Sequence, residues 1–335
     1  MKKVLILGAT GAMATYLVPH LINSGYSVTG ITLEDVLSDT EKLNYIKANA
    51  KDKSFLSEIL SEGFDAIVDF LVYNTKEMFR EYFDIFKESG AHYIFLSSYR
   101  VYSGEYPITE ETPRIFDTPL PDGFVTDLEY SIYKAEEEDL LRSSGYPRYT
   151  IVRPAVTYSS RRFQLTTLEA NVLIPRMLAG KTVTLPEGAM DCEATMTWAG
   201  DIAKMIGAII LNPEAYGETY TVSTSEHHTW REIAEMYKRV FGLKYVAIPD
   251  DDYLDIFGFG VYARQQLKYD RCFMRIIDNS KIMKLAGLRP GDLMPLEEGL
   301  KLELSSLNDK RISEIGCYRD MNDRMDAYLS DKGIR

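Results

Sequence analysis

The sequence predicts an α/β fold, with a doubly wound parallel sheet and a smaller C-terminal α/β lobe. Short apolar runs alternate with segments of helical periodicity from residue 4 to residue 153, the first run ends in a glycine turn, and the pattern becomes irregular after residue 155. At 335 residues the chain is also longer than one compact domain usually is. We therefore expect two lobes, the first of them built around the sheet.

The chain begins with a predicted strand, a tight turn and an amphipathic helix. Residues 4–7 are apolar and end at Gly8, and apolar residues then recur at helical spacing through 14–22, before Gly25. Residues 26–33, YSVTGITL, predict a second strand, and a weaker segment at 43–50 predicts a third.

Further strands and helices alternate up to residue 153. We predict helices at 54–61, 76–89 and 128–143, and strands at 66–72, 92–97 and 149–153. A proline-rich loop at 107–121 precedes the third of these helices, and Gly-Tyr-Pro at 145–147 ends it. We then predict a helix at 199–211, a strand at 218–223 and a helix at 230–241, with long loops at 155–195 and 245–275.

Composition excludes several classes of function. The net charge of −12, from 50 acidic and 38 basic residues, disfavours a nucleic-acid partner. The cysteines, Cys192, Cys272 and Cys317, lack CxxC spacing, as in proteins of reducing compartments, and the four histidines lack metal-ligand spacing. No apolar stretch reaches the roughly 20 residues of a membrane span, and the N-terminal run is too short for a signal peptide. We expect a cytoplasmic protein without a metal or a membrane partner.

The turn GATGAMA, residues 8–14, has the spacing of a dinucleotide-binding loop. Gly8 would make the tight turn, Gly11 would let a pyrophosphate approach the backbone, and Ala14 is small enough for the helix to pack on the strand. Thr32 stands where an acidic residue usually binds the ribose diol. The neighbouring Glu34 would repel a 2′-phosphate, which favours NAD over NADP and leaves NADP open.

Tyr130 and Lys134 are candidates for acid–base chemistry. Four residues apart, they share a helix face, where an ammonium would lower the pKa of a phenol toward neutrality. Ser98 follows a predicted central strand and could hold a substrate oxygen beside Tyr130. The alternatives are a turn-capping serine and a half-buried aromatic residue, and the same Tyr-Lys spacing recurs at Tyr328.

Several motifs, in order, support these assignments: GATGAMA, AIVDFLV, FLSSYRVY, Tyr130 with Lys134, IVRPAVTYS, TWAGDIA, GETYTVSTSEHHTWREIA and IIDNSKIMKLAGLRPGDLMPLEEGLK. Over nearly its whole length the chain resembles the extended short-chain dehydrogenases/reductases of the NAD-dependent epimerase/dehydratase family, which includes UDP-glucose 4-epimerase. The resemblance implies a Rossmann domain at 1–165 plus 190–229 and a substrate-binding lobe at 166–189 plus 230–335. By analogy, the helices at 76–89 and 128–143 would form a homodimer interface.

The resemblance also implies residue roles. Ser98, Tyr130 and Lys134 would be the catalytic set, with Lys134 also binding the nicotinamide ribose. The cofactor contacts would be Gly8, Thr10, Gly11, Ala12 and Met13 in the turn, Thr32 at the ribose, Asn49 and Ala50 at the adenine, Leu71 and Val72 along the middle, and Pro154 and Val156 at the carboxamide. Substrate contacts would fall on Tyr99, Asn171, Lys268 and Arg271, with Arg161 and Arg162 as further sources of positive charge.

Departures from the family pattern narrow the activity. Dehydratases of the family carry an acidic pair after the serine or threonine, whereas this chain has Tyr99 and Arg100, which favours epimerisation. We expect an NAD-dependent nucleotide-sugar epimerase or related oxidoreductase, the alternative being an NADP-dependent keto-sugar reductase. The segments FGFGVYARQQLKYDR and RIIDNSKIMKLAGLRPG are also similar to the branch that contains chloroplast stem-loop RNA-binding proteins. An RNA-binding or cofactor-sensing protein is therefore the alternative from another class.

Overall fold

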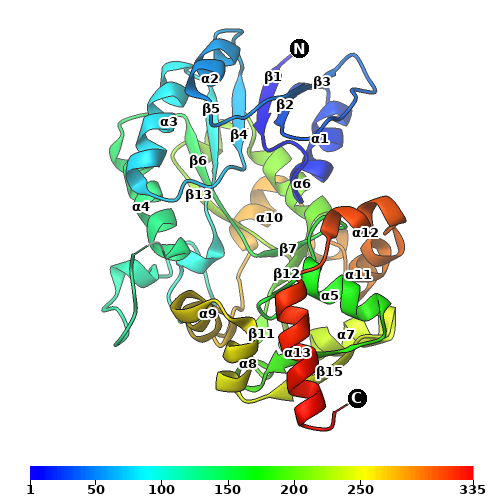
Figure 1. Cartoon of the computed structure of the whole chain (residues 1–335). Coiled ribbons are helices and arrows are strands. Elements are labelled where there is room, and N and C mark those ends of the chain that lie inside the picture. The colour runs from blue at the N-terminus through cyan, green and yellow to red at the C-terminus, as the bar shows by residue number, and fades with distance from the viewer. Residues whose placement is uncertain (128, 335) are drawn as a thin grey trace.

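Seven parallel strands form the central sheet of this computed structural model, which describes residues 1–127 and 129–334 (Figure 1). Their order is β13-β6-β5-β4-β1-β2-β3, and the pairings are parallel. The strands are β1 (Lys3–Leu7), β2 (Ser27–Thr32), β3 (Leu43–Lys47), β4 (Ala66–Asp69), β5 (His92–Leu96), β6 (Tyr149–Pro154) and β13 (Thr219–Val222). This order, with the switch between β1 and β4, confirms the predicted doubly wound fold.

Helices cover both faces of the sheet. One face carries α1 (Ala14–Asn23), α6 (Ala199–Ile209) and α10 (Ser280–Ala286), and the other carries α2 (Lys53–Leu60), α3 (Lys76–Glu88) and α4 (Tyr130–Ser143). Within β1, Val4 packs toward α1 and Leu5 toward the α2 and α3 face. A strand buried on both faces must be apolar at every position, which explains the unbroken run at residues 4–7.

The second lobe consists of helices around small sheets. Its helices are α5 (Ala170–Leu178), α7 (Trp230–Phe241), α8 (Asp250–Phe257), α9 (Gly260–Gln266), α11 (Leu296–Ser305), α12 (Asp309–Ile315) and α13 (Arg319–Asp331). Two pairs are parallel: β7 (Val156–Tyr158) with β12 (Met196–Trp198), and β10 (Thr182–Pro186) with β15 (Lys244–Ile248). Two pairs are antiparallel: β8 (Gln164–Leu165) with β9 (Leu168–Glu169), and β11 (Glu193–Ala194) with β14 (His228–Thr229).

Short helical turns occupy several of the loops. These are the segments Tyr99–Val101, Ile115–Asp117, Glu187–Ala189, Pro213–Ala215 and Pro290–Asp292, together with a π-helical segment at Leu267–Arg271. The turn Tyr99–Val101 begins just after β5, and the predicted catalytic residue Ser98 is its N-cap.

Glu303 joins the lobes through three hydrogen bonds. This buried carboxylate on α11 accepts hydrogen bonds from the Tyr16 hydroxyl on α1, from Trp198 Nε1 at 2.5 Å and from the backbone N–H of Ser160 at 2.6 Å. The rings of Tyr16 and Trp198 also meet edge to face, with centroids 4.9 Å apart. We call this group the Glu303 junction.

The predicted elements of the first lobe form within a few residues of their expected limits. The predicted start of the long helix, Leu128, lies outside the described residues, and α4 is described from Tyr130. The predicted strand at 66–72 ends earlier, at Asp69, because the Asp69 carboxylate accepts a hydrogen bond from the backbone N–H of Leu71 at 2.9 Å and turns the chain. The limits of the two domains stay a prediction.

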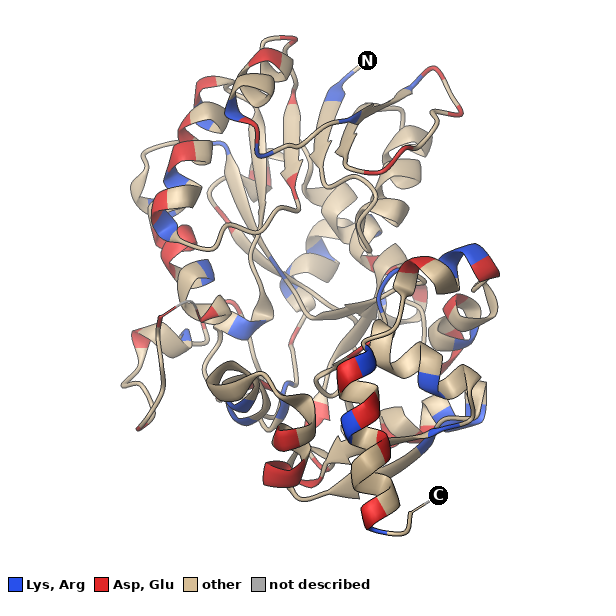
Figure 2. Cartoon of the chain, in the orientation of Figure 1, with Lys and Arg blue, Asp and Glu red and all other residues tan. Residues whose placement is uncertain are grey.

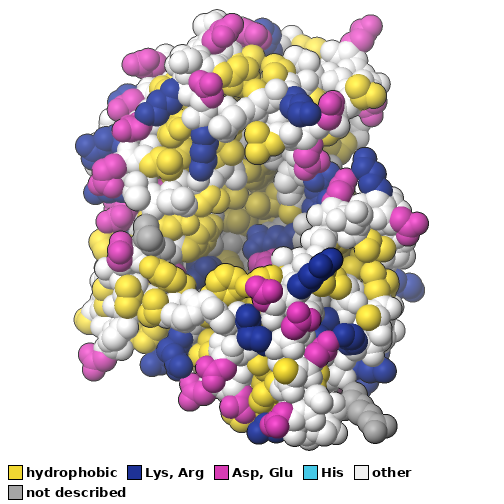
Figure 3. Space-filling view, viewed as in Figure 1, with side chains coloured by type: hydrophobic (Ala, Val, Ile, Leu, Met, Phe, Trp, Pro, Cys, Tyr) yellow, Lys and Arg dark blue, Asp and Glu magenta, His cyan; other side chains and the backbone are white. Residues whose placement is uncertain are grey.

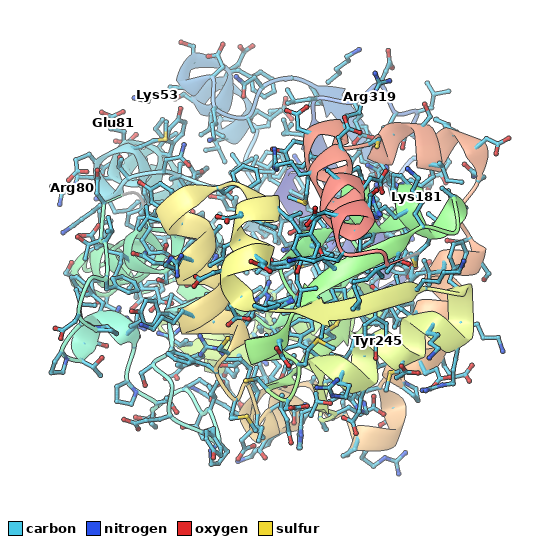
Figure 4. All side chains as sticks on the ribbon, turned by 60° about the horizontal axis from the view of Figure 1, so that its bottom comes forward. Lys53, Arg80, Glu81, Lys181, Tyr245 and Arg319 are labelled. Carbon is cyan, nitrogen blue, oxygen red and sulfur yellow. The ribbon has the colours of Figure 1, made fainter. Side chains whose placement is uncertain are left out.

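Charges of both signs are interspersed over the outer helices. Figure 2 shows acidic and basic segments alternating along α3, α4 and α13. On this outer surface Lys53 pairs with Glu81 beside Arg80, and Lys181 pairs with Asp326 near α13 (Figure 4). Among the described residues, no helix has both the length and the apolar character that crossing a membrane requires.

Candidate functional site

A groove with a volume of about 720 Å³ runs along the carboxyl ends of β1, β2 and β4. Figure 3 shows it as a hollow between the lobes, with hydrophobic side chains on its floor. Ten residues predicted to bind the cofactor line it: Gly8, Thr10, Gly11, Ala12, Met13, Thr32, Asn49, Ala50, Leu71 and Val72. The remaining walls include Lys51, Tyr130 and three arginines from the second lobe, Arg161, Arg162 and Arg311.

The glycine turn is held tightly against β2. Gly8 has a φ of +80°, and the backbone N–H groups of Gly8 and Ala9 both donate to the carbonyl of Ile31, each at 3.0 Å. A Cβ at Gly30 would lie 2.7 Å from the Ala9 side chain, so β2 needs a glycine there. These contacts fix the turn at the entrance to α1.

The first turn of α1 fits a diphosphate. Met13, at its N-cap, makes no capping hydrogen bond with its side chain, and the first turn has no acidic residue. Ala12, Met13 and Ala14 all line the groove. Free N–H groups and the positive end of the helix dipole are therefore directed at the groove, as an anionic ligand requires.

Neutral side chains occupy the ribose and adenine positions. The Thr32 hydroxyl lies 2.7 Å from the Thr10 hydroxyl and accepts a hydrogen bond from the backbone N–H of Glu34 at 3.0 Å. Thr32 thus supports the turn and adds no charge. The Asn49 amide oxygen accepts from the Lys51 N–H at 3.0 Å, and its NH₂ group is left to donate to a ligand.

A second cavity of about 320 Å³ adjoins the groove. The two share Met13, Val72, Leu96, Tyr130 and Arg162 in their walls. The predicted carboxamide contacts Pro154 and Val156 line this second cavity, as do Ser98, Tyr99 and Arg271. We call it the substrate cavity.

Ser98 and Tyr130 both line the substrate cavity. Ser98 caps the short helix Tyr99–Val101, since its Oγ accepts a hydrogen bond from the Arg100 N–H at 3.2 Å. Its O–H is left to donate to a ligand. Tyr130 opens α4 and is half-buried, with the Arg100 guanidinium 5.2 Å from its ring centroid and the Tyr133 ring edge-on at 5.4 Å.

Lys134 lies in a buried ion pair. Its Nζ is 2.9 Å from Glu137 Oε2 and 4.5 Å from the centroid of the Phe95 ring. Lys134 is 1% exposed and is not among the lining residues of either cavity. The sequence analysis did not identify Glu137, although it stands on the same helix face three residues further on.

Arg271 reaches the substrate cavity from the C-terminal part of the chain. Its guanidinium donates to the carbonyl of Thr166 at 2.7 Å and to the Tyr99 hydroxyl at 2.8 Å, and it pairs with Asp270. Burial raises the pKa of Tyr99 to about 12, so its phenol stays protonated. Asp270 also lies 3.4 Å from Arg100 and 3.3 Å from Arg275, so three arginines surround this carboxylate, and Arg100 is also paired with Glu129 at 3.0 Å.

Two predicted substrate residues lie elsewhere. Lys268 is exposed, with its ammonium over the Tyr269 ring, and Asn171 uses its backbone carbonyl to accept from the Tyr318 N–H at 3.0 Å. Neither is among the lining residues of the substrate cavity. Gln164 and Glu169 line it instead, on two-residue strands that have no detectable sequence periodicity.

Known proteins share this fold. The UDP-glucose 4-epimerase of Thermotoga maritima, solved with UDP-glucose, has a TM-score of 0.66 at 19% identity, over 90% of this chain and 97% of that one. The dTDP-glucose 4,6-dehydratase of Bacillus anthracis, solved in complex with NAD, has a TM-score of 0.70 at 16% identity, over 94% of this chain and 100% of that one. Both have the same fold as this protein.

A sequence relative comes from Arabidopsis thaliana. Its chloroplast stem-loop binding protein of 41 kDa b is 25% identical over an alignment of 260 residues. The match covers 72% of this chain and 64% of that protein, so it spans less than two thirds of that protein's length. The sequence profile of the NAD dependent epimerase/dehydratase family matches residues 4–223, a range that includes the glycine turn, Ser98 and Tyr130. With this match and the groove that its residues line, the chain belongs to the NAD dependent epimerase/dehydratase family.

Proposed function

We propose that this protein is an NAD-dependent epimerase of nucleotide sugars, or a closely related oxidoreductase. The observation that carries the proposal is the place of Tyr130, which lines both the groove and the substrate cavity. A residue at that junction would lie beside the nicotinamide end of the cofactor and also beside the reacting hydroxyl of a substrate. Ser98 lines the same substrate cavity.

The proposed chemistry divides between the cofactor and the chain. NAD, when bound, supplies a ring that accepts a hydride and can return it. The Tyr130 phenolate would accept the proton of the substrate hydroxyl whose carbon loses the hydride, while the Ser98 hydroxyl donates a hydrogen bond to the same oxygen. Tyr130 would give the proton back to the same oxygen when the hydride is returned to the other face of the carbon, which would complete an epimerisation.

The substrate cavity supports an anionic substrate. Arg271, Arg162 and Arg100 line it, and the guanidinium of Arg271 is held in place by Tyr99 and Thr166. Fixed guanidinium groups suit the oxygen atoms of a diphosphate. The UDP-glucose and dTDP-glucose in the names of the structural neighbours are substrates of this class.

Epimerisation is favoured over dehydration because Ser98 is followed by no free acid. Tyr99 is hydrogen-bonded to Arg271, and Arg100 is paired with Glu129 at 3.0 Å. Elimination of water needs a general acid at the leaving hydroxyl.

We also propose a homodimer through α3 and α4 and a cytoplasmic location.

One observation favours a second candidate function, RNA binding: the similarity to the chloroplast stem-loop binding protein. The net charge of −12 and the interspersed acidic groups of Figure 2 oppose binding to a phosphate backbone. A protein that binds RNA would have to use a local basic surface, so we rank this function second.

The test is incubation of the protein with NAD and, one at a time, UDP-glucose, UDP-galactose and dTDP-glucose. We expect at least one sugar to give its C4 epimer by NMR, with a transient absorbance at 340 nm from NADH; UDP-glucose and UDP-galactose are each other's C4 epimers and should react together or not at all. A stoichiometric, lasting rise at 340 nm would indicate a dehydrogenase. No change with any of the three sugars, together with tight binding of an RNA stem-loop, would favour the second function.

A further inference from the structure

Three ionisable side chains are buried together between α4 and the sheet. Lys134 and Asp69 are each 1% exposed, and Glu137 is 0% exposed. Lys134 Nζ lies 2.9 Å from Glu137 Oε2, and the Phe95 ring covers the ammonium on another side. Asp69 is close enough to affect the ionisation of Glu137 and to be affected by Lys134. Two carboxyl groups therefore share one ammonium.

The two carboxyl groups, Asp69 and Glu137, differ in the hydrogen bonds that they accept. Asp69 accepts hydrogen bonds from the Tyr73 hydroxyl at 2.8 Å, the Tyr93 hydroxyl at 2.6 Å and the Leu71 N–H at 2.9 Å. Among the described residues, the Glu137 oxygens have no hydrogen-bond donor other than their ion-pair partner Lys134. A buried carboxylate with one partner depends on that partner for its charge.

The other titratable groups near Glu137 are an ion-paired glutamate and three tyrosines. Glu138, the next residue on α4, is paired with Arg153 at 2.5 Å. Tyr133 on the same helix and Tyr73 and Tyr93 on the sheet side have pKa values raised by burial first, with Glu137 adding to the rise. None of these groups supplies a positive charge, so within residues 1–127 and 129–334 Lys134 is the cation that compensates Glu137.

Lys134 lies between two possible partners of its ammonium on one face of α4, Tyr130 and Glu137. Tyr130, Lys134 and Glu137 are spaced i, i+4 and i+7, so the lysine has Tyr130 one turn before it and Glu137 one turn after it. Tyr130 lines the groove and Glu137 does not. Because a lysine side chain has a flexible four-carbon stem, its ammonium can lie beside either Tyr130 or Glu137.

We propose that Glu137 is a positioning residue for Lys134. As a carboxylate it holds the ammonium in the buried pair, and when it takes up a proton from solvent it releases the ammonium toward Tyr130 and the groove. Cofactor binding is then coupled to uptake of that one proton. This inference rests on the proposed function, in which Lys134 binds the nicotinamide ribose.

The electrostatics support a transition near neutral pH. Burial raises the pKa of Glu137 to about 7, while the Lys134 ammonium opposes the rise. Burial also raises the pKa of Asp69. The Glu137 carboxyl group therefore changes its charge within the pH range in which binding can be measured.

The test is the affinity for NADH, measured by its fluorescence at pH 6 and pH 8, of the wild type, Glu137→Gln and Glu136→Gln. Glu136 is the adjacent, half-buried residue of α4, and the structure records no ion pair for it among the described residues. We expect about tenfold weaker binding at pH 8 than at pH 6 for the wild type and Glu136→Gln, because the protonated fraction of a group with a pKa near 7 falls about tenfold. We expect Glu137→Gln to bind equally at both pH values.

Two further measurements keep the outcomes separate. In the folded, cofactor-free protein the pKa of Glu137 is raised from 4.5 to about 7. The contribution of Glu137 to the free energy of unfolding is therefore fully present below about pH 4.5 and is lost as the pH rises through about 7. In urea titrations Glu137→Gln should not show this loss. Glu137→Asp, which keeps the carboxylate, should restore pH-dependent binding. Equal pH dependence in the wild type and Glu137→Gln contradicts the positioning role alone. Failure of the wild type to bind NADH at either pH contradicts the proposed function and the coupling with it.

Discussion

Arg161 and Glu34 join the two lobes across the groove by a two-armed ion pair. Arg161 Nη1 lies 2.7 Å from Glu34 Oε1, and Nη2 lies 3.0 Å from Oε2. Glu34 follows β2, and Arg161 lies in the turn after β7, which Arg311 supports by donating to the Ser160 carbonyl at 2.9 Å. The hydrogen bonds from Arg161 lower the pKa of Glu34, so the pair persists in mildly acidic solution. Both residues line the groove, and we call this ion pair the clasp.

Opening this clasp should speed cofactor release. We expect Glu34→Gln to raise the dissociation rate of NADH several-fold in stopped-flow displacement, because the lobes lose one connection over the groove. The free energy of unfolding should change by less than about 1 kcal/mol, since both side chains are partly exposed. The control is Glu297→Gln, which breaks a similar two-armed pair with Arg239 at 3.0 and 2.7 Å, and Glu297 is not a lining residue of the groove. Equal dissociation rates in the two variants would rule out the clasp.

Loss of the Tyr130 hydroxyl should stop turnover. For Tyr130→Phe we expect at least a 100-fold fall in kcat with the substrate identified from the sugar panel, because no other phenol is expected to take the proton. NADH affinity should stay within about threefold of the wild type, since the ring remains. Tyr328→Phe is the matched control. Tyr328 has the same spacing to a lysine but lies on the outer helix α13, where its hydroxyl donates a hydrogen bond to Asp252 of α8 at 2.8 Å. Full activity of Tyr130→Phe would remove this residue from the mechanism.

Arg271 should bind the anionic part of the substrate, and Lys268 should not. We expect Arg271→Gln to weaken binding of UDP in calorimetry by about 10-fold to 100-fold, the range for a hydrogen bond to a charged group. Arg271→Lys, which keeps the buried charge beside Asp270, guards against loss of folding and should bind UDP with intermediate affinity. Lys268→Gln should bind UDP like the wild type. A larger loss in Lys268→Gln would place the diphosphate outside the cavity described.

The Glu303 junction should contribute to stability. In Glu303→Gln, one acceptor oxygen becomes an NH₂ group, which then faces either the Tyr16 and Trp198 donors at Oε1 or the Ser160 N–H at Oε2. We expect the free energy of unfolding to fall by about 2 kcal/mol, the cost of leaving a buried donor unsatisfied. Glu298→Gln, on the exposed side of the same helix, should change it by less than about 0.5 kcal/mol. Equal stability of the two variants in urea would show that the junction contributes nothing.

The groove could be predicted because its residues are fixed by local backbone positions. The glycine turn and the end of β2 follow from apolar runs and glycine spacing, and the groove is lined there by Gly8, Thr10, Gly11, Ala12, Met13, Ile31 and Thr32. Side-chain direction could not be predicted in the same way. Lys268 and Arg271 share one helical segment, and only packing of that segment against Thr166 and Tyr99 buries one of them.

The Lys134 pairing shows the same limit on one helix. Sequence spacing places Tyr130 and Glu137 at equally suitable distances from Lys134, and only burial selects the carboxylate. In the second lobe, strands of two residues such as β8 and β9 are too short for a period of two to be visible. Helices α8, α9, α11, α12 and α13 form there by packing around core residues such as Trp230 and Leu300, which are distant in sequence.

The central claim is that the groove binds NAD, and the most direct measurement is identification of the nucleotide. Freshly purified protein is denatured, and the released nucleotides are identified by mass spectrometry, followed by calorimetric titration of the stripped protein with NAD and NADP. We predict near-stoichiometric NAD, or tight rebinding of NAD in preference to NADP. Release and rebinding of NADP would make the reductase the better assignment, and a protein that neither releases nor binds either nucleotide would contradict the account.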